Sequence, residues 1–106
     1  MPTVYQREAA RQDLLDHFIY LADNAGLAVA ERFLTNAEAS FNELAINPLI
    51  GSPLTLQHSE LAGMRKWRIK NFDNILIFYL PCHDGISIVR VLHAAQDWWG
   101  LLGLIH

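Results

Sequence analysis

Apolar residues recur along the first half of the chain with the spacing of α-helices. From Glu8 to Asp23 they return every three or four positions, and Leu15 and Ile19 widen the stripe. Leu27 to Ala45 repeats this spacing, and Asn24-Ala25-Gly26 supplies residues that close a helix. We therefore expect an antiparallel helix hairpin. Its two stripes consist of Ala10, Leu14, Phe18, Leu21 and Ala22, and of Ala30, Phe33, Leu34, Ala37, Phe41 and Leu44.

The second half of the chain has the spacing of β-strands. Met64 to Lys70 alternates, placing Met64, Lys66, Arg68 and Lys70 on one face, and Ile86 to His93 alternates too. Ile75 to Leu80 is apolar on both faces, which predicts a central strand. Turn-forming residues at positions 71–74 and 81–85 link the three segments, so an antiparallel meander is expected.

The remaining segments complete the predicted fold. A short strand is expected at residues 3–7, and Asn47-Pro48 ends the second helix. Gly51-Ser52-Pro53 reads as the turn of a loop that reaches His58, and the tail from Ala94 starts a short helix. The pattern therefore predicts one α+β domain over residues 1–106, with an N-terminal strand, a helix hairpin and a small, mainly antiparallel sheet that the hairpin covers.

Charge divides the chain unequally. The formal net charge is -3, which argues against a protein that mainly grips a phosphate backbone. Residues 1–60 carry three arginines and eight carboxylates, whereas residues 61–106 carry five lysines and arginines and three carboxylates. The two halves are therefore expected to face different surroundings, and sequence-specific nucleic-acid binding is not expected.

Several classes of site and location are disfavoured. The five histidines lack metal-ligand spacing, so no metal or cofactor is expected. Cys82-His83-Asp84 contains the residue types of a nucleophilic triad, but consecutive residues in a tight turn point apart, and we interpret them as a turn. With one cysteine, no secretory signal and no apolar run long enough for a bilayer, a cytoplasmic protein is expected, without membrane association.

The order of elements and a few short motifs resemble those of a known family. The motifs are Asn47-Pro48 with Gly51, Gly63-Met64-Arg65, the block from Phe72 to Tyr79, and Arg90-Val91-Leu92-His93 followed by Asp97. Over nearly its whole length the chain resembles the RelE/ParE superfamily of toxins from type II toxin-antitoxin modules, and the ParE branch more closely than the RelE branch.

The resemblance implies two alternative activities. RelE-type toxins are ribosome-dependent messenger RNA endoribonucleases, and RNA cleavage needs groups that move protons and stabilise phosphorane charge. The catalytic arginine of that branch aligns near Leu76, its later cationic position aligns near His93 or Ala94, and no tyrosine follows Tyr79. These absences favour the ParE-type activity, inhibition of DNA gyrase through protein contact, over catalysis. A non-toxic relic that only binds an antitoxin is the third alternative.

Five residues are candidates for target binding under this resemblance. They are Arg65, Arg68, Lys70, Arg90 and His93. The alternative for the first three is a solvated sheet edge, where cations discourage aggregation. Arg90 lies among apolar residues, so an ion pair with an acidic helix residue is an equal alternative. His93 reads either as a hydrogen-bond donor to the target or as a structural histidine.

The C-terminal tail supplies candidates for a second interface. Large exposed apolar side chains usually mark an interaction surface. A cognate ParD-like antitoxin is the implied partner, and the resemblance suggests that its C-terminal segment covers this tail. The alternative is a tail that folds back over the helix hairpin. The antitoxin-binding candidates are Trp98, Trp99, Leu101 and Leu102.

Overall fold

The computed structural model describes residues 2–54, 62–96 and 98–102, except for the side chains of Trp98 and Trp99. In these residues an N-terminal strand precedes two long helices, and the remaining strands and a short helix follow. The elements are β1 (Thr3–Gln6), α1 (Glu8–Ala25), α2 (Leu27–Ile46), β2 (Ser52–Pro53), β3 (Arg65–Ile69), β4 (Phe72–Cys82), β5 (Gly85–His93) and α3 (Trp98–Leu101).

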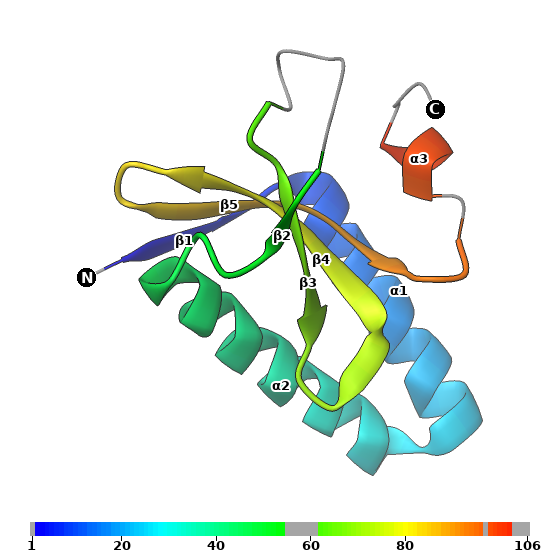
Figure 1. The fold of residues 1–106 in the computed structure, drawn as a ribbon. Helices are drawn as coiled ribbons and strands as arrows, with labels where there is room; N and C mark the ends of the chain where they lie inside the picture. The colour runs from blue at the N-terminus through cyan, green and yellow to red at the C-terminus, as the bar shows by residue number, and fades with distance from the viewer. Residues whose placement is uncertain (1, 55–61, 97, 103–106) are drawn as a thin grey trace.

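The described strands form one sheet in the order β1-β5-β4-β3-β2. β2, β3, β4 and β5 pair antiparallel with their neighbours, whereas β1 pairs parallel with β5. Helices α1 and α2 lie side by side against the sheet, as Figure 1 shows. The predicted α+β class, the helix hairpin and the antiparallel meander are therefore confirmed.

The helix hairpin turns at a single residue. Gly26 lies between the two helices with φ at 99°, a conformation that glycine adopts without a Cβ clash. The predicted apolar stripes are only partly buried, because Leu15 and Ile19 are 50% and 49% exposed and Leu34 is 42% exposed. These three residues were expected on the covered face. That expectation is wrong because the sheet covers a narrower band of each helix.

The main core lies between the helices and the sheet. Phe33 of α2 is fully buried and contacts the rings of His17 and Phe72 edge to face, at centroid distances of 5.9 and 5.4 Å. Side chains from both helices and from all three meander strands join this cluster, including Phe41, Leu44, Ile69, Ile77, Tyr79, Ile88 and Val91.

A second, smaller core lies on the other face of the sheet. Because side chains alternate along a strand, Phe78 points away from the cluster that holds Ile77 and Tyr79. Leu102 packs against this second cluster, so the described part of the tail covers the sheet face opposite the helices. The alternative in which the tail folds over the helix hairpin is therefore wrong for Leu102. The fully or largely buried members are Met64, Phe78, Val89 and Leu92.

The predicted turns are shorter in the structure. Ser52-Pro53, expected as part of a turn, forms β2 and pairs with Lys66 and Arg65. Ile69 pairs with Phe72, which leaves Lys70 and Asn71 as the β3–β4 turn. Asn71 has φ at 65°, which asparagine tolerates better than most residues. β4 therefore extends beyond both of its predicted ends, Ile75 and Leu80, whereas β3 ends at Ile69, one residue before its predicted end.

Candidate functional site

Arg68 and Lys70 are exposed beside the β3–β4 turn. Both line a polar cavity of about 350 Å³, which Glu43 and Ser40 border from α2. The alternation predicted for this strand is shifted, because the β3–β4 register changes between Arg68 and Ile69. The structure nevertheless places these two candidate cations on one side of the hairpin.

Weak contacts hold the Arg68 side chain. Its Nε lies 3.5 Å from Oδ1 of Asp73, and both side chains are more than half exposed. Its Cζ also lies 4.8 Å from the ring centroid of Trp67. A solvent-exposed ion pair of this kind contributes little to stability. The Arg68 guanidinium is therefore available for a partner at small cost.

The backbone of Lys70 is fixed more firmly than its side chain. Its N–H donates to Oγ of Ser40 at 3.0 Å, and that hydroxyl donates to the carbonyl of Asn36 at 2.8 Å. Ser40 is almost completely buried, which suits a polar group with both partners. This contact positions the β3–β4 turn on α2 while the Lys70 ammonium faces solvent.

Arg65 has a structural role in the loop that follows α2. Its Nη1 donates to the carbonyls of Leu49 and Gly51, at 3.1 and 2.7 Å. Tyr79 supports the same loop, since its hydroxyl donates to the carbonyl of Pro48 at 2.7 Å and accepts from Gly51 N–H at 3.0 Å. Burial raises the pKa of Tyr79. Tyr79 ends the Phe72–Tyr79 motif, but that motif indicated no role for its hydroxyl.

Gly51 is required by the same contacts. A Cβ at this position would overlap the Tyr79 hydroxyl and lie 2.9 Å from the carbonyl of Lys66. Only glycine lets the loop approach β3 and β4 this closely. The Asn47-Pro48 and Gly51 motif therefore corresponds to a loop held by Tyr79 and Arg65.

Arg90 forms a two-pronged ion pair with α1. Its Nε and Nη2 donate to the two carboxylate oxygens of Asp13 at 2.7 and 2.8 Å. These hydrogen bonds raise the pKa of Arg90 further. Its Nη1 donates to the carbonyl of Leu101 at 3.3 Å. The ion-pair alternative is what the structure shows, and Asp13 is the helix residue involved.

Helix α1 also takes the place of a strand beside β5. β1 pairs with β5 only as far as Gln6 and Ile88, and Arg7 N–H then donates to the carbonyl of Ile88. Beyond that point Val91 N–H donates to Asp13 at 2.9 Å, and Nε2 of His17 donates to the carbonyl of Val91 at the same distance. Asp13 and His17, one helical turn apart, thus provide hydrogen-bond partners for the N–H and the carbonyl of Val91 at the open edge of β5.

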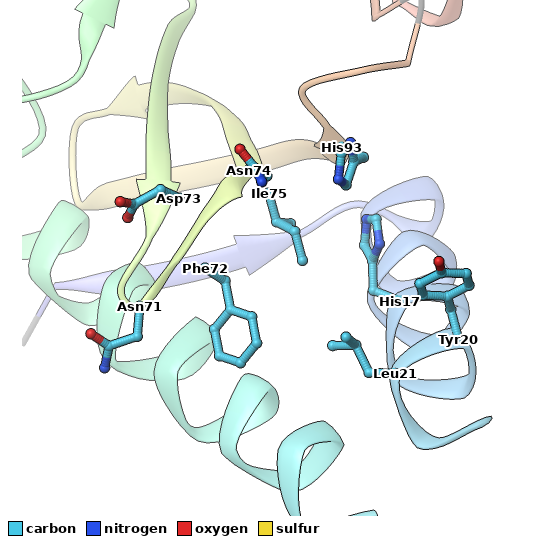
Figure 2. Close-up of a pocket in the computed structure, with 9 residues that line it drawn as sticks. All are labelled: His17, Tyr20, Leu21, Asn71, Phe72, Asp73, Asn74, Ile75 and His93. Atoms are coloured by element: carbon cyan, nitrogen blue, oxygen red, sulfur yellow. The ribbon is translucent and has the colours of Figure 1, made fainter. Parts of the chain in front are cut away.

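His93 lies at the end of β5, on the other side of the hairpin from the polar cavity. Its Nδ1 accepts a hydrogen bond from Ala95 N–H at 3.0 Å, and its own N–H donates to Oε1 of Gln96 at 2.6 Å. An Nδ1 that accepts carries no proton, so the imidazole is neutral with its proton on Nε2. His93 lines the pocket that Figure 2 shows, away from Arg68 and Lys70.

The tail candidates separate into two pairs. Leu101 is 45% exposed, whereas Leu102 packs against the second core. The side chains of Trp98 and Trp99 lie outside the described residues. Of the four candidates, Leu101 is therefore the one whose exposed side chain is described.

The β4–β5 turn holds a small polar cluster. The hydroxyl of Tyr5 donates to Oδ2 of Asp84 at 2.6 Å, which raises the pKa of Tyr5 and lowers the pKa of Asp84. Cys82 and His83 are exposed, and each contacts the Oδ1 of Asp84, at 3.7 and 3.9 Å. His83 and Asp84 form the turn, as expected, whereas Cys82 is the last residue of β4 and pairs with Gly85.

The described ranges contain neither a metal-binding cluster nor a membrane-spanning helix. Within residues 2–54, 62–96 and 98–102, no group of three histidine, cysteine, aspartate or glutamate residues is placed to hold a metal ion. Among the helices formed by those residues, none has the length and apolar character needed to cross a membrane.

The five target-binding candidates do not lie at one site. Arg65 and Arg90 form hydrogen bonds within the fold, Arg68 and Lys70 line one cavity, and His93 lines another pocket.

Comparisons with known proteins identify a family and a shared fold. A family model for the ParE toxin of the type II toxin-antitoxin system parDE matches residues 4–98. A solved structure titled as the chromosomal ParDE TA system from P. aeruginosa matches with a TM-score of 0.71. It is 16% identical in sequence, and the match covers 88% of this chain and 96% of the other. No curated protein matches the chain.

Proposed function

The chain belongs to the ParE toxin family of type II toxin-antitoxin systems, and on this premise we propose that it inhibits DNA gyrase by protein contact until a cognate antitoxin sequesters it. The family match over residues 4–98 carries the proposal. It is a proposal about binding rather than catalysis, and it assigns no covalent step to any residue.

The surroundings of Leu76 and His93, which align near the catalytic positions of RelE-type toxins, support a binding role. Leu76 pairs with Leu92 and packs against the second core, so this strand position offers no cation. The Nδ1 of His93 is occupied by Ala95 N–H. RNA cleavage needs convergent groups for proton transfer and charge stabilisation, and Leu76 can supply neither.

Arg68 and Lys70 are the proposed target contacts. Both are exposed on the β3–β4 hairpin, whereas Arg65 and Arg90 are already hydrogen-bonded within the fold. Exposed cations at the rim of an interface steer association and select partners of opposite charge. We propose that an acidic or DNA-bearing surface of gyrase meets this hairpin, and that Leu101 belongs to the antitoxin-binding surface.

A supercoiling assay with purified gyrase tests the proposal. The wild-type chain is expected to inhibit supercoiling, and Arg68→Glu with Lys70→Glu is expected to raise the concentration for half inhibition about tenfold, because like charges would then face each other. Arg11→Glu with Arg32→Glu is the matched control, since it changes the net charge equally on exposed helix positions.

Two results would contradict the proposal. Absence of inhibition by the wild-type chain at any excess would remove gyrase as the target. Equal inhibition by the hairpin variant and the control variant would remove Arg68 and Lys70 as contacts. Cleaved messenger RNA in a translation extract containing the chain would instead support the ribonuclease alternative.

A further inference from the structure

A pocket beside His93 has no role in the function proposed above. It lies between α1 and the β3–β4 hairpin and has a volume of about 310 Å³ (Figure 2). A neighbouring hollow of about 380 Å³ shares three of its residues, His17, Tyr20 and His93. Two recesses therefore meet at one cluster of ring side chains.

The floor of the pocket is apolar. Leu21 from α1 and Phe72 and Ile75 from β4 line it with apolar side chains, and Figure 2 shows these side chains pointing into the same space. Phe72 is held by its edge-to-face contact with buried Phe33, 5.4 Å between ring centroids. Ile75 pairs with His93 across the β4–β5 ladder. Such a floor suits a flat apolar group such as an aromatic ring.

Hydrogen bonds to the backbone fix the protons of the two imidazoles. His17 donates through Nε2 to the carbonyl of Val91, so its Nδ1 is left as an acceptor in the neutral ring. His93 accepts through Nδ1 from Ala95 N–H, so its Nε2–H is left as a donor. His17 and His93 both line the pocket, so its lining includes one ring with an acceptor nitrogen and one ring with a donor nitrogen, with the exposed Tyr20 ring beside them.

We propose that this pocket binds a tyrosine side chain of a partner protein. The ring lies on Leu21, Phe72 and Ile75, and the hydroxyl donates to Nδ1 of His17 and accepts from Nε2–H of His93. A phenol hydroxyl is both donor and acceptor, so it satisfies both imidazoles. A carboxylate has no proton for His17 and would face Asp73 at the rim, whereas an ammonium group has no acceptor for His93.

The proposal goes beyond gyrase inhibition. The pocket lies on the other side of the β3–β4 hairpin from Arg68 and Lys70, and its binding is measured without gyrase or antitoxin. A failed supercoiling assay would therefore leave this proposal standing, and the reverse also holds.

Titration of the ¹⁵N-labelled full chain with N-acetyl-tyrosinamide, followed by NMR, tests the pocket. We expect chemical-shift changes at the amides of residues 17–21, 72–75 and 93. N-acetyl-phenylalaninamide, which lacks only the hydroxyl, is expected to bind about tenfold more weakly, because two hydrogen bonds are lost. His93→Leu removes one of the two hydrogen bonds, so it is expected to weaken the tyrosine probe about threefold and to leave the phenylalanine probe unchanged.

A second measurement needs no variant. The imidazole ¹⁵N resonances of His17 Nδ1 and His93 Nε2 in the wild-type chain are expected to shift with the tyrosine probe and not with the phenylalanine probe. Equal affinity for the two probes would overturn the proposal, as would the absence of shifts in the pocket. Tighter binding of adenosine than of the tyrosine probe would also overturn it and would indicate a nucleobase site.

Discussion

At the residue scale, Asp13 connects α1 to β5 through three hydrogen bonds that its carboxylate accepts. Its carboxylate accepts from Nε and Nη2 of Arg90 and from Val91 N–H. The side chain is about 10% exposed, so few water molecules replace these contacts if it is removed. The residue therefore links α1 to β5 and neutralises a partly buried arginine.

Replacing Asp13 with alanine is expected to lower the free energy of unfolding by about 3 kcal/mol, because it leaves Arg90 and Val91 N–H without a partner. Urea denaturation measures the loss. Asp16→Ala, on an exposed position one turn further along α1, serves as the control and is expected to change stability by less than about 0.5 kcal/mol. A similar effect of the two substitutions would show that the Asp13 contacts add nothing.

Tyr79 makes stability depend on pH in the alkaline range. Its folded-state pKa is raised above the ordinary value of 10.0 by burial, so the fold favours the protonated phenol. The stability that this preference contributes is present below pH 10 and is lost as pH rises through the folded-state pKa.

Tyr79→Phe is therefore expected to reduce the fall in stability above pH 10 and to cost about 1 kcal/mol at pH 7 through the lost hydrogen bonds. Chemical denaturation across a pH series measures both effects. Tyr20→Phe, at an exposed tyrosine, is expected to leave the pH profile unchanged. A Tyr79→Phe profile that matches the wild type would contradict the assignment to this phenol.

The sequence did not identify the structural roles of Asp13 and Tyr79, because their partners lie far away along the chain. Asp13 and Arg90 lie 77 positions apart, and Asp13 falls on the polar side of the helical repeat, among carboxylates that face solvent. Charge next to apolar residues correctly indicated that Arg90 needs a partner, but nothing in the local spacing identified it. Tyr79 lies inside an apolar strand, where its hydroxyl contacts a loop 31 positions away.

At the scale of elements, helices were predicted better than turns. Both helix starts were predicted, and the helices end one or two residues later than expected. Helix ends follow local residues such as Gly26 and Asn47-Pro48. Strand ends follow pairing with another strand: Phe72 pairs with Ile69 and Ile75 pairs with His93, and the polar residues Asp73 and Asn74 lie between these two pairs within β4.

The parallel pairing of β1 with β5 depends on Gly85. A Cβ there would overlap the backbone of Thr3, whereas a Cβ at Gly63 would meet nothing within 4 Å, although both glycines have positive φ. Gly85→Ala is expected to cost at least about 2 kcal/mol and Gly63→Ala about 1 kcal/mol, from backbone strain alone.

Hydrogen exchange separates the two effects. The amides of β1 are expected to lose protection in the Gly85→Ala variant and to keep it in the Gly63→Ala variant. Retained protection of β1 in both variants would show that β1 tolerates a displaced turn.

At the scale of the whole molecule, the sheet has two unequal sides. Two helices cover one face, and Leu54 and Leu102 help to cover the smaller core on the other. The continuous apolar run from Ile75 to Leu80 predicted a central strand with both faces buried. The α+β architecture was therefore predictable, whereas the separation of Arg68 and Lys70 from His93 was not, because it depends on which side of the hairpin each residue reaches.

The helix hairpin also presents an apolar outer stripe. Leu15 and Ile19 are about half exposed, so packing within the chain buries only part of each side chain. Leu15→Gln with Ile19→Gln is expected to change the free energy of unfolding by less than about 0.5 kcal/mol. Leu14→Gln with Leu21→Gln, at half-buried positions against the main core, is expected to cost several times more, and urea denaturation compares the two pairs. Equal losses would place Leu15 and Ile19 in the core.

The use of α1 as a substitute strand restricts how this fold can change in length. Asp13 and His17 reach Val91 only at one rotation of the helix about its axis. Deleting a single residue between Arg7 and Asp13 would turn both side chains by about 100° around that axis and leave the amide and carbonyl of Val91 unpaired. Surface substitutions in α1 are thus compatible with the fold, while a change of one residue in the length of its first turns is not.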